Sequence, residues 1–201
     1  MIKVIIIVAL LAILIFSIVR KLKIFGSLGE SSRLNASTET IEIVAPLSLY
    51  KSLVQKTLFT VAIGIGLLLI TIILASKFKI ALIMLPISIY LIAQFFILNN
   101  HIKIAKSQHL SYNINSHNLS VQSENNKILN INILNDIKSL QEVKAVQKNN
   151  GILFGYYKII TVTNEVVYIP FLISENLQTK PFFEKLQLFN REIETKLFPV
   201  I

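Results

Sequence analysis

The sequence predicts an α+β membrane protein in which three transmembrane helices precede a small antiparallel β-sheet or barrel module, closed by a C-terminal amphipathic helix. Residues 57–76 and 80–98 are uncharged apolar runs, and residues 2–19 form a third run with a single lysine. Each approaches the ~20 residues that a helix needs to cross about 30 Å of hydrocarbon. The module is predicted by a change in the spacing of apolar residues. They alternate with a period of two from residue 110, which indicates strands, and recur every three or four residues after residue 181, which indicates a helix.

Composition places most of the apolar and basic excess in the first half of the chain. The 201 residues are 53% hydrophobic, with a mean hydropathy of +0.64. Residues 1–98 carry nine Lys or Arg against three Glu, a net +6, whereas residues 99–201 carry eleven against eight acids, a net +3. The second half lacks the basic bias of a nucleic-acid binder, so we expect no nucleic-acid partner. With no cysteine, the chain has no disulfide, thiolate metal site or thiol nucleophile.

Residues 1–20 are predicted to form a first membrane helix whose N-terminus lies outside the cell. A cleaved signal peptide would instead place its basic residues in front of a short apolar core, followed by a small-x-small site. Here the charge follows the run, at Arg20, Lys21 and Lys23, which we expect on the cytoplasmic side against anionic lipid. Residues 21–39 are small and polar, and are predicted to form a cytoplasmic linker.

Residues 40–56 are predicted to form a short strand and a helix that leads into the membrane. The strand alternates (TIEIV), and Pro46 ends it. Because this strand has no local partner, we expect it to join the sheet formed after the hairpin.

Residues 57–98 are predicted to form a transmembrane helical hairpin, because only three residues separate the two apolar runs. Ala62 and Gly66 form a small-xxx-small pair that permits close helix approach. Pro86 can kink the second helix of the hairpin, and Gln94 is expected to hydrogen-bond to the neighbouring helix. A substrate or ion path is the alternative, but neither span contains an Asp, Glu, Lys, Arg or His to mark one.

Residues 108–198 are predicted to form the cytoplasmic module. Six short strands are expected, at residues 110–115, 119–122, 128–133, 139–147, 157–163 and 166–169, with a turn at residues 116–118. The last element is predicted to be one amphipathic helix, with Pro181 in its first turn. Its apolar stripe consists of Phe182, Leu186, Phe189, Ile193 and Leu197.

This order of elements resembles the YcxB-like bacterial membrane proteins across roughly residues 40–197. The resemblance is carried by residues 40–43 (TIEI), Tyr50, residues 134–137 (LNDI) with Val143, residues 167–171 (VYIPF) and the stripe from Phe182. Similar sequences often have a tryptophan near residues 134–135, whereas this chain has none, and its first membrane helix is additional. The resemblance implies a pleckstrin-homology-like (PH-like) C-terminal module at the inner membrane, and no defined biochemical role.

No catalytic, cofactor-binding or metal-binding constellation is evident in the sequence. His101, His109 and His117 are eight residues apart, a spacing that brings no two imidazoles to one metal on a helix, so we expect interfacial or surface histidines. Asp136, the single aspartate, is expected to cap or turn the chain between two strands. We therefore expect no cofactor and no enzymatic activity.

Phe154, Tyr156 and Tyr157, beside Gly155, are either an exposed patch for protein contact or part of the core. Specific phosphoinositide binding is not expected, because the loop at residues 115–118 lacks fixed positive charge. The leading hypothesis is a non-enzymatic, multi-pass protein of the bacterial inner membrane whose module binds another protein. The alternative is a self-associating pore or transport accessory, a homo-oligomer with Gln94 and Pro86 at its interface.

Overall fold

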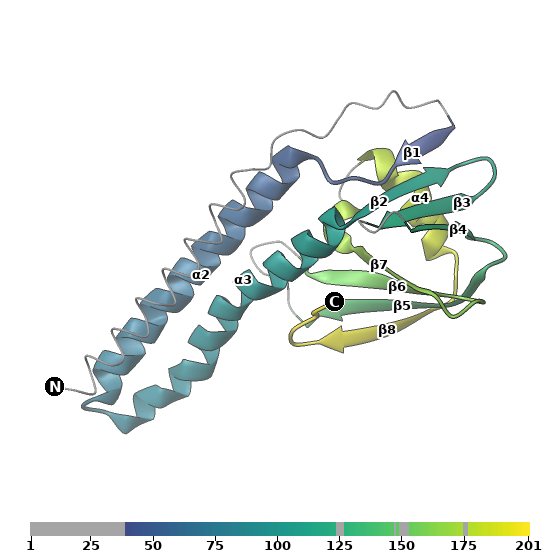
Figure 1. Ribbon diagram of the computed structural model, residues 1–201. Coiled ribbons are helices and arrows are strands. Elements are labelled where there is room, and N and C mark those ends of the chain that lie inside the picture. Colours follow the sequence, from purple (N-terminus) through teal and green to yellow (C-terminus); the bar gives the residue numbers. More distant parts are fainter. Residues whose placement is uncertain (1–38, 124–126, 147, 149–152, 175–176) are drawn as a thin grey trace. The chain divides into compact units, whose positions relative to one another are not determined.

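Figure 1 shows the computed structural model, which describes residues 39–123, 127–146, 148, 153–174 and 177–201. All of these residues belong to one compact unit, Ala36–Ile201. The predicted first membrane helix, all but the last residue of the predicted linker at residues 21–39, and the basic cluster Arg20, Lys21 and Lys23 lie outside the described residues.

Two antiparallel helices form the predicted hairpin. Helix α2 spans Leu47–Ala75, a short 3-10 helix η1 spans Lys79–Met84, and α3 spans Leu85–Lys106. Both α2 and the stretch Lys79–Lys106 are long and apolar enough to cross a membrane. At 29 residues and 1.5 Å rise, α2 is about 43 Å long, which exceeds the ~30 Å of a hydrocarbon core. It begins directly after Pro46, as predicted.

The hairpin contains two glycines, Gly64 and Gly66, and α2 and α3 are in close contact at Gly64. A Cβ added there would lie 2.8 Å from Leu91 Cβ and 3.2 Å from the Ile92 backbone nitrogen. The prediction that Ala62 and Gly66 make this approach is wrong within this chain, because Ala62 is exposed and Gly66 has open space around it. Residues two apart on a helix differ by about 200° in direction, so residues 62 and 66 point away from α3.

Pro86 and Gln94 also differ from their predicted roles. Pro86 lies in the first turn of α3, where its missing N–H costs no helical hydrogen bond, and the departure from α-helix precedes it in η1. Gln94 is buried, but its Nε2 donates to the carbonyl of Tyr90 on its own helix at 3.4 Å. The predicted bond to the neighbouring helix is therefore not made.

The first sheet confirms that the strand before the hairpin joins the strands after it. Its order is β1-β2-β3-β4, and every pair is antiparallel. The strands are β1 Thr40–Glu42, β2 Gln108–Asn113, β3 Asn118–Ser123 and β4 Ile128–Asn132. Ile41 lies opposite Tyr112, so the chain enters and leaves the hairpin through adjacent strands.

The second sheet has the order β7-β6-β5-β8. Its strands are β5 Ile137–Ala145, β6 Gly155–Thr161, β7 Val166–Pro170 and β8 Arg191–Lys196. The β5–β6 and β6–β7 pairs are antiparallel, whereas β8 runs parallel to β5. The described strands thus form two separate sheets and not a closed, wholly antiparallel barrel.

The predicted C-terminal helix is wrong beyond its first two turns. After the short 3-10 helices η2 (Phe171–Ile173) and η3 (Leu177–Thr179), helix α4 spans only Lys180–Gln187. The chain then turns and becomes β8, which leaves Ile193 and Leu197 of the expected stripe exposed. As a strand, residues 191–196 form backbone hydrogen bonds with the edge of β5. This pairing also brings Arg191 Nε to 2.8 Å from Glu142 Oε2.

The module's core lies between the inner faces of the two sheets and α4. Inward-facing residues recur along the inner strands of both sheets, among them Leu110 and Tyr112 of β2 and Ile159 of β6, whereas the edge strands β1 and β8 contribute no buried residue. Phe182 of α4 is fully buried, with its ring 5.2 Å from that of Tyr112. The amphipathic part of the prediction therefore holds for α4, and Pro181 lies in its first turn as expected.

Candidate binding groove

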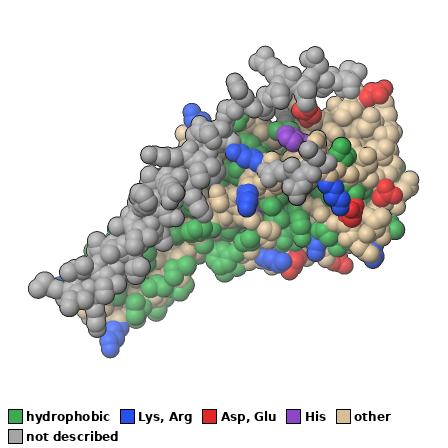
Figure 2. Space-filling view, in the orientation of Figure 1, with side chains coloured by type: hydrophobic (Ala, Val, Ile, Leu, Met, Phe, Trp, Pro, Cys, Tyr) green, Lys and Arg blue, Asp and Glu red, His purple; other side chains and the backbone are tan. Residues whose placement is uncertain are grey.

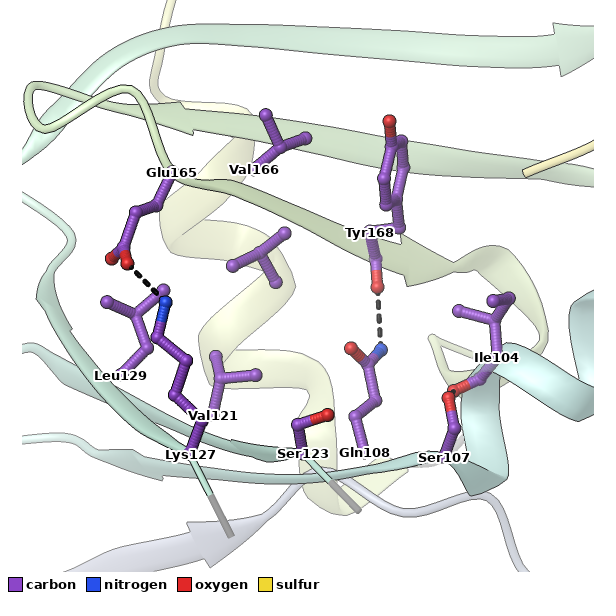
Figure 3. A pocket seen from close by; sticks show the side chains of 11 residues that line it. Ile104, Ser107, Gln108, Val121, Ser123, Lys127, Leu129, Glu165, Val166 and Tyr168 are labelled. Atoms are coloured by element: carbon purple, nitrogen blue, oxygen red, sulfur yellow. Dashed lines mark hydrogen bonds and ion pairs between the residues drawn. The ribbon is translucent and has the colours of Figure 1, made fainter. Parts of the chain in front are cut away.

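A groove of about 370 Å³ separates the first sheet from the outer edge of β7. Its walls come from the end of α3, the adjoining ends of β2, β3 and β4, and β7 itself (Figure 3). The lining residues are Ile104, Ser107, Gln108, Val121, Ser123, Lys127, Leu129, Glu165, Val166, Val167 and Tyr168. This volume lies near the lower end of the range for ligand pockets, about 300–1,000 Å³.

Two polar contacts connect the first sheet to β7 across the groove, as Figure 3 shows. Gln108 Nε2 donates to the backbone carbonyl of Tyr168 at 2.6 Å. Lys127 Nζ lies 2.8 Å from Glu165 Oε1, with the lysine side chain mostly exposed. An exposed ion pair of this kind contributes only about 0–1 kcal/mol, so the Lys127–Glu165 bridge can open at small cost.

The edge of β7 that faces the groove carries backbone groups not used in pairing with β6. Thr161 N donates to Glu165 O at 3.0 Å, which makes residues 161 and 165 a hydrogen-bonded pair. In an antiparallel ladder such pairs recur at every second residue, so Val167 and Ile169 are the β7 residues that bond to β6. Val166 and Tyr168 therefore direct their N–H and C=O groups away from β6. The Gln108 bond to the Tyr168 carbonyl agrees with this assignment, and Pro170 ends the edge without an N–H.

The floor of the groove is apolar and its rim is polar. The floor is formed by Val121 and Val167, which are both buried and come from opposite sides of the groove. Ser107, Ser123 and the Lys127–Glu165 pair supply polar groups around them. An apolar floor with a few polar groups at the rim is the usual composition of a binding site.

The structure gives the three histidines separate environments. His101 is buried, and its Nε2 donates to the Pro199 carbonyl at 2.7 Å, so the surface location expected for it is wrong, whereas the interfacial location stays a prediction. His117 Nδ1 lies 3.0 Å from the Tyr112 hydroxyl, and His109 is exposed on β2. Within the described ranges, no three His, Cys, Asp or Glu side chains gather to hold a metal ion.

Asp136 has the turn-forming role that the sequence predicts. Its Oδ2 accepts from the backbone N–H of Asn132 at 2.8 Å, and its own N–H donates to the Asn132 carbonyl at 2.9 Å. These two bonds close the turn between β4 and β5.

The aromatic group at residues 154–157 belongs to the core and is not an exposed contact patch. Phe154, Tyr156 and Tyr157 are only 3%, 5% and 7% exposed. Burial raises the pKa of the Tyr157 phenol, and the Glu142 carboxylate raises it further, against an opposing effect of Arg191. Of the two alternatives that the sequence left open, the structure supports core packing.

Sequence reasoning missed the groove. Alternation in residues 166–169 predicts a strand, but it does not say which edge of that strand lacks a partner. Gln108 and Lys127 lie far from β7 in sequence, and only the folded chain brings them to it. Comparisons with protein families, curated proteins and solved structures find no match to this chain.

Proposed function

We propose that this protein is a non-enzymatic, multi-pass protein of the bacterial inner membrane whose cytoplasmic module binds another protein through the groove beside β7. The resemblance to YcxB-like proteins and to PH-like modules is part of this proposal. Support comes from two helices apolar enough to cross a membrane and from a two-sheet module continuous with them.

The distribution of lysines favours a cytoplasmic module. Four exposed lysines, Lys51, Lys56, Lys103 and Lys106, lie near the ends of α2 and α3 that join the module. Of the basic residues that the structure describes, only Lys77 and Lys79 lie at the opposite tip, where Figure 2 shows basic side chains beyond the apolar surface. Because basic residues are enriched on the cytoplasmic side, the tip is assigned to the outside.

The observation that carries the binding proposal is the unpaired edge of β7 inside a groove. Val166 presents its N–H and C=O, and Tyr168 its N–H, beside an apolar floor, and an extended peptide can add to such an edge as a further strand. The Tyr168 carbonyl, which accepts from Gln108, would exchange that bond for one from the peptide. Main-chain hydrogen bonds would then supply affinity, and alternate side chains of the peptide would contact Val121 and Leu129. We therefore take the partner to be an extended segment of another protein.

In-cell photo-crosslinking tests this proposal with the full tagged chain. A photoreactive amino acid at Leu129, in the groove, should yield one discrete crosslinked protein. The same group at Val162, exposed on the β6–β7 turn, should not. Val166→Pro, which removes an outward N–H without removing a bond to β6, should abolish the product, whereas Val166→Thr should retain it. Equal crosslinking from both positions, or a product insensitive to Val166→Pro, would refute binding at this edge.

Orientation is tested separately, because the chain has no cysteine of its own. A cysteine at the exposed Phe78 should react with an impermeant reagent in intact cells, whereas one at Val162 should react only after permeabilisation. The opposite pattern would place the module outside the cytoplasm.

The self-associating pore is the weaker proposal. Gln94 is buried and bonded to its own helix, and Pro86 occupies a first turn, so neither presents a polar surface to another copy.

A further inference from the structure

The residues that follow β8 run along α3, the second helix of the hairpin. His101 Nε2 donates to the Pro199 carbonyl at 2.7 Å. Asn100 exchanges two hydrogen bonds with the Ile201 backbone, of 3.1 Å from Nδ2 to the carbonyl and 2.8 Å from the Ile201 nitrogen to Oδ1. The Phe198 ring lies 5.7 Å from that of Tyr90. These contacts fix residues 197–201 against the helix.

The contact with Tyr90 sets the depth of Phe198. Tyr90 lies eight residues before Leu98, where the apolar run ends, which corresponds to about 12 Å along the helix axis. Polar residues begin immediately afterwards, at Asn99 and Asn100. When the hairpin crosses a bilayer, Tyr90 therefore lies within the hydrocarbon, and the Phe198 ring lies at or below the boundary.

Three side chains of this segment are apolar and remain exposed, even though the Phe198 ring also contacts Tyr90. Leu197, Phe198 and Val200 are 54%, 39% and 53% exposed, whereas Pro199 is buried against His101. Val146, exposed on the neighbouring strand end, joins them, because its N–H donates to the Lys196 carbonyl at 3.2 Å. This small apolar surface adjoins the apolar part of α3, because the Phe198 ring contacts Tyr90.

We propose that residues 197–200 are an interfacial membrane anchor whose Leu197, Phe198 and Val200 side chains insert into the bilayer beside α3. The partner is lipid, because the surface lies level with a segment whose other outward side chains are already assigned to acyl chains. Aromatic and aliphatic side chains buried about 5–10 Å below the headgroups are typical of such anchors. The anchor joins the second sheet to the bilayer through β8. This inference rests on the proposed membrane insertion of the hairpin.

The chain contains no tryptophan, so one introduced tryptophan reports a single site. The full chain is reconstituted in phosphatidylcholine–phosphatidylglycerol vesicles, with and without lipid brominated in mid-chain, and its fluorescence is measured. Phe198→Trp and Val200→Trp probe the anchor. Phe96→Trp, on the exposed surface of α3, tests the hairpin, and Val162→Trp, on the β6–β7 turn, is the water-exposed control.

We expect quenching of Phe198→Trp by brominated lipid to be comparable to that of Phe96→Trp and several-fold greater than that of Val162→Trp. Val200→Trp should be quenched to an intermediate degree. Quenching at Phe96→Trp without quenching at either anchor position would overturn the anchor and leave the membrane hairpin intact. No quenching at Phe96→Trp would remove the membrane assignment itself, and the anchor with it.

Discussion

Gly64 provides a sharp test of the packing between α2 and α3, because Gly66 on the same helix is its matched control. A Cβ at residue 64 would lie 2.8 Å from Leu91 Cβ and 3.2 Å from the Ile92 backbone nitrogen, whereas one at residue 66 would meet nothing within 4 Å. Carbon atoms pack best at about 3.5–4.0 Å, so Gly64→Ala is roughly 0.7–1.2 Å too close to Leu91. Because a backbone atom of Ile92 also crowds the site, the helices must separate.

The two substitutions share the same gain in helix propensity, up to about 1 kcal/mol for Gly to Ala. Their difference therefore isolates the steric effect, which for overpacking is about 1–3 kcal/mol. We expect Gly66→Ala to leave the free energy of unfolding unchanged or to raise it slightly. Gly64→Ala should lie about 1–3 kcal/mol below Gly66→Ala, a five- to hundredfold change in the unfolding equilibrium at about 1.4 kcal/mol per tenfold.

The assay is reversible denaturant unfolding of the full chain in detergent micelles, followed by helical circular dichroism. Equal unfolding free energies for the two variants would refute the assignment of the contact to Gly64. A larger loss for Gly66→Ala than for Gly64→Ala would instead restore the small-xxx-small pair of Ala62 and Gly66 as the packing face.

Two further predictions concern the second sheet. Arg191→Met should lower the module's free energy of unfolding by about 1–3 kcal/mol, because the largely buried Glu142 carboxylate loses its 2.8 Å partner. Adding Glu142→Gln should recover part of this loss in the same denaturation assay. If the double variant recovers nothing, the ion-pair explanation is contradicted. The folded-state pKa of Tyr157 is raised above its ordinary value of 10.0, so its contribution to stability is complete below about pH 10 and is lost as the pH rises through the higher folded value. Thermal melts of Tyr157→Phe should therefore fall less steeply with pH above 10 than those of the unmodified chain, and parallel curves would show that Tyr157 does not contribute.

The elements predicted best from sequence are those determined by local periodicity. The hairpin, the helix that begins after Pro46 and the strands from β2 to β7 follow from apolar runs of membrane length or from alternation with a period of two. Joining β1 to the later strands was also predictable, because an isolated strand before a hairpin must pair elsewhere.

The predictions that failed depend on contacts between distant residues. Residues 191–196 alternate weakly and also fit the helical stripe from Phe182, so only the open edge of β5 and the Glu142 carboxylate make them β8. For Phe154 the sequence left an exposed patch and core packing open, and the choice of core depends on His101 of α3, whose ring centroid lies 5.9 Å from that of Phe154. Neither the pairing of residues 191–196 with β5 nor the contact between Phe154 and His101 can be identified from the local sequence.

The sequence by itself determined that this chain has two adjacent helices long and apolar enough to cross a membrane and a strand-rich module, because hydrocarbon thickness and strand pleating impose lengths and periods on consecutive residues. Tertiary structure decided which glycine lets the helices approach, which edge of β7 faces a groove and where residues 197–201 lie. Each of those outcomes depends on which surfaces meet, because apolar burial and backbone hydrogen bonding stabilise contacts that no single segment can make alone.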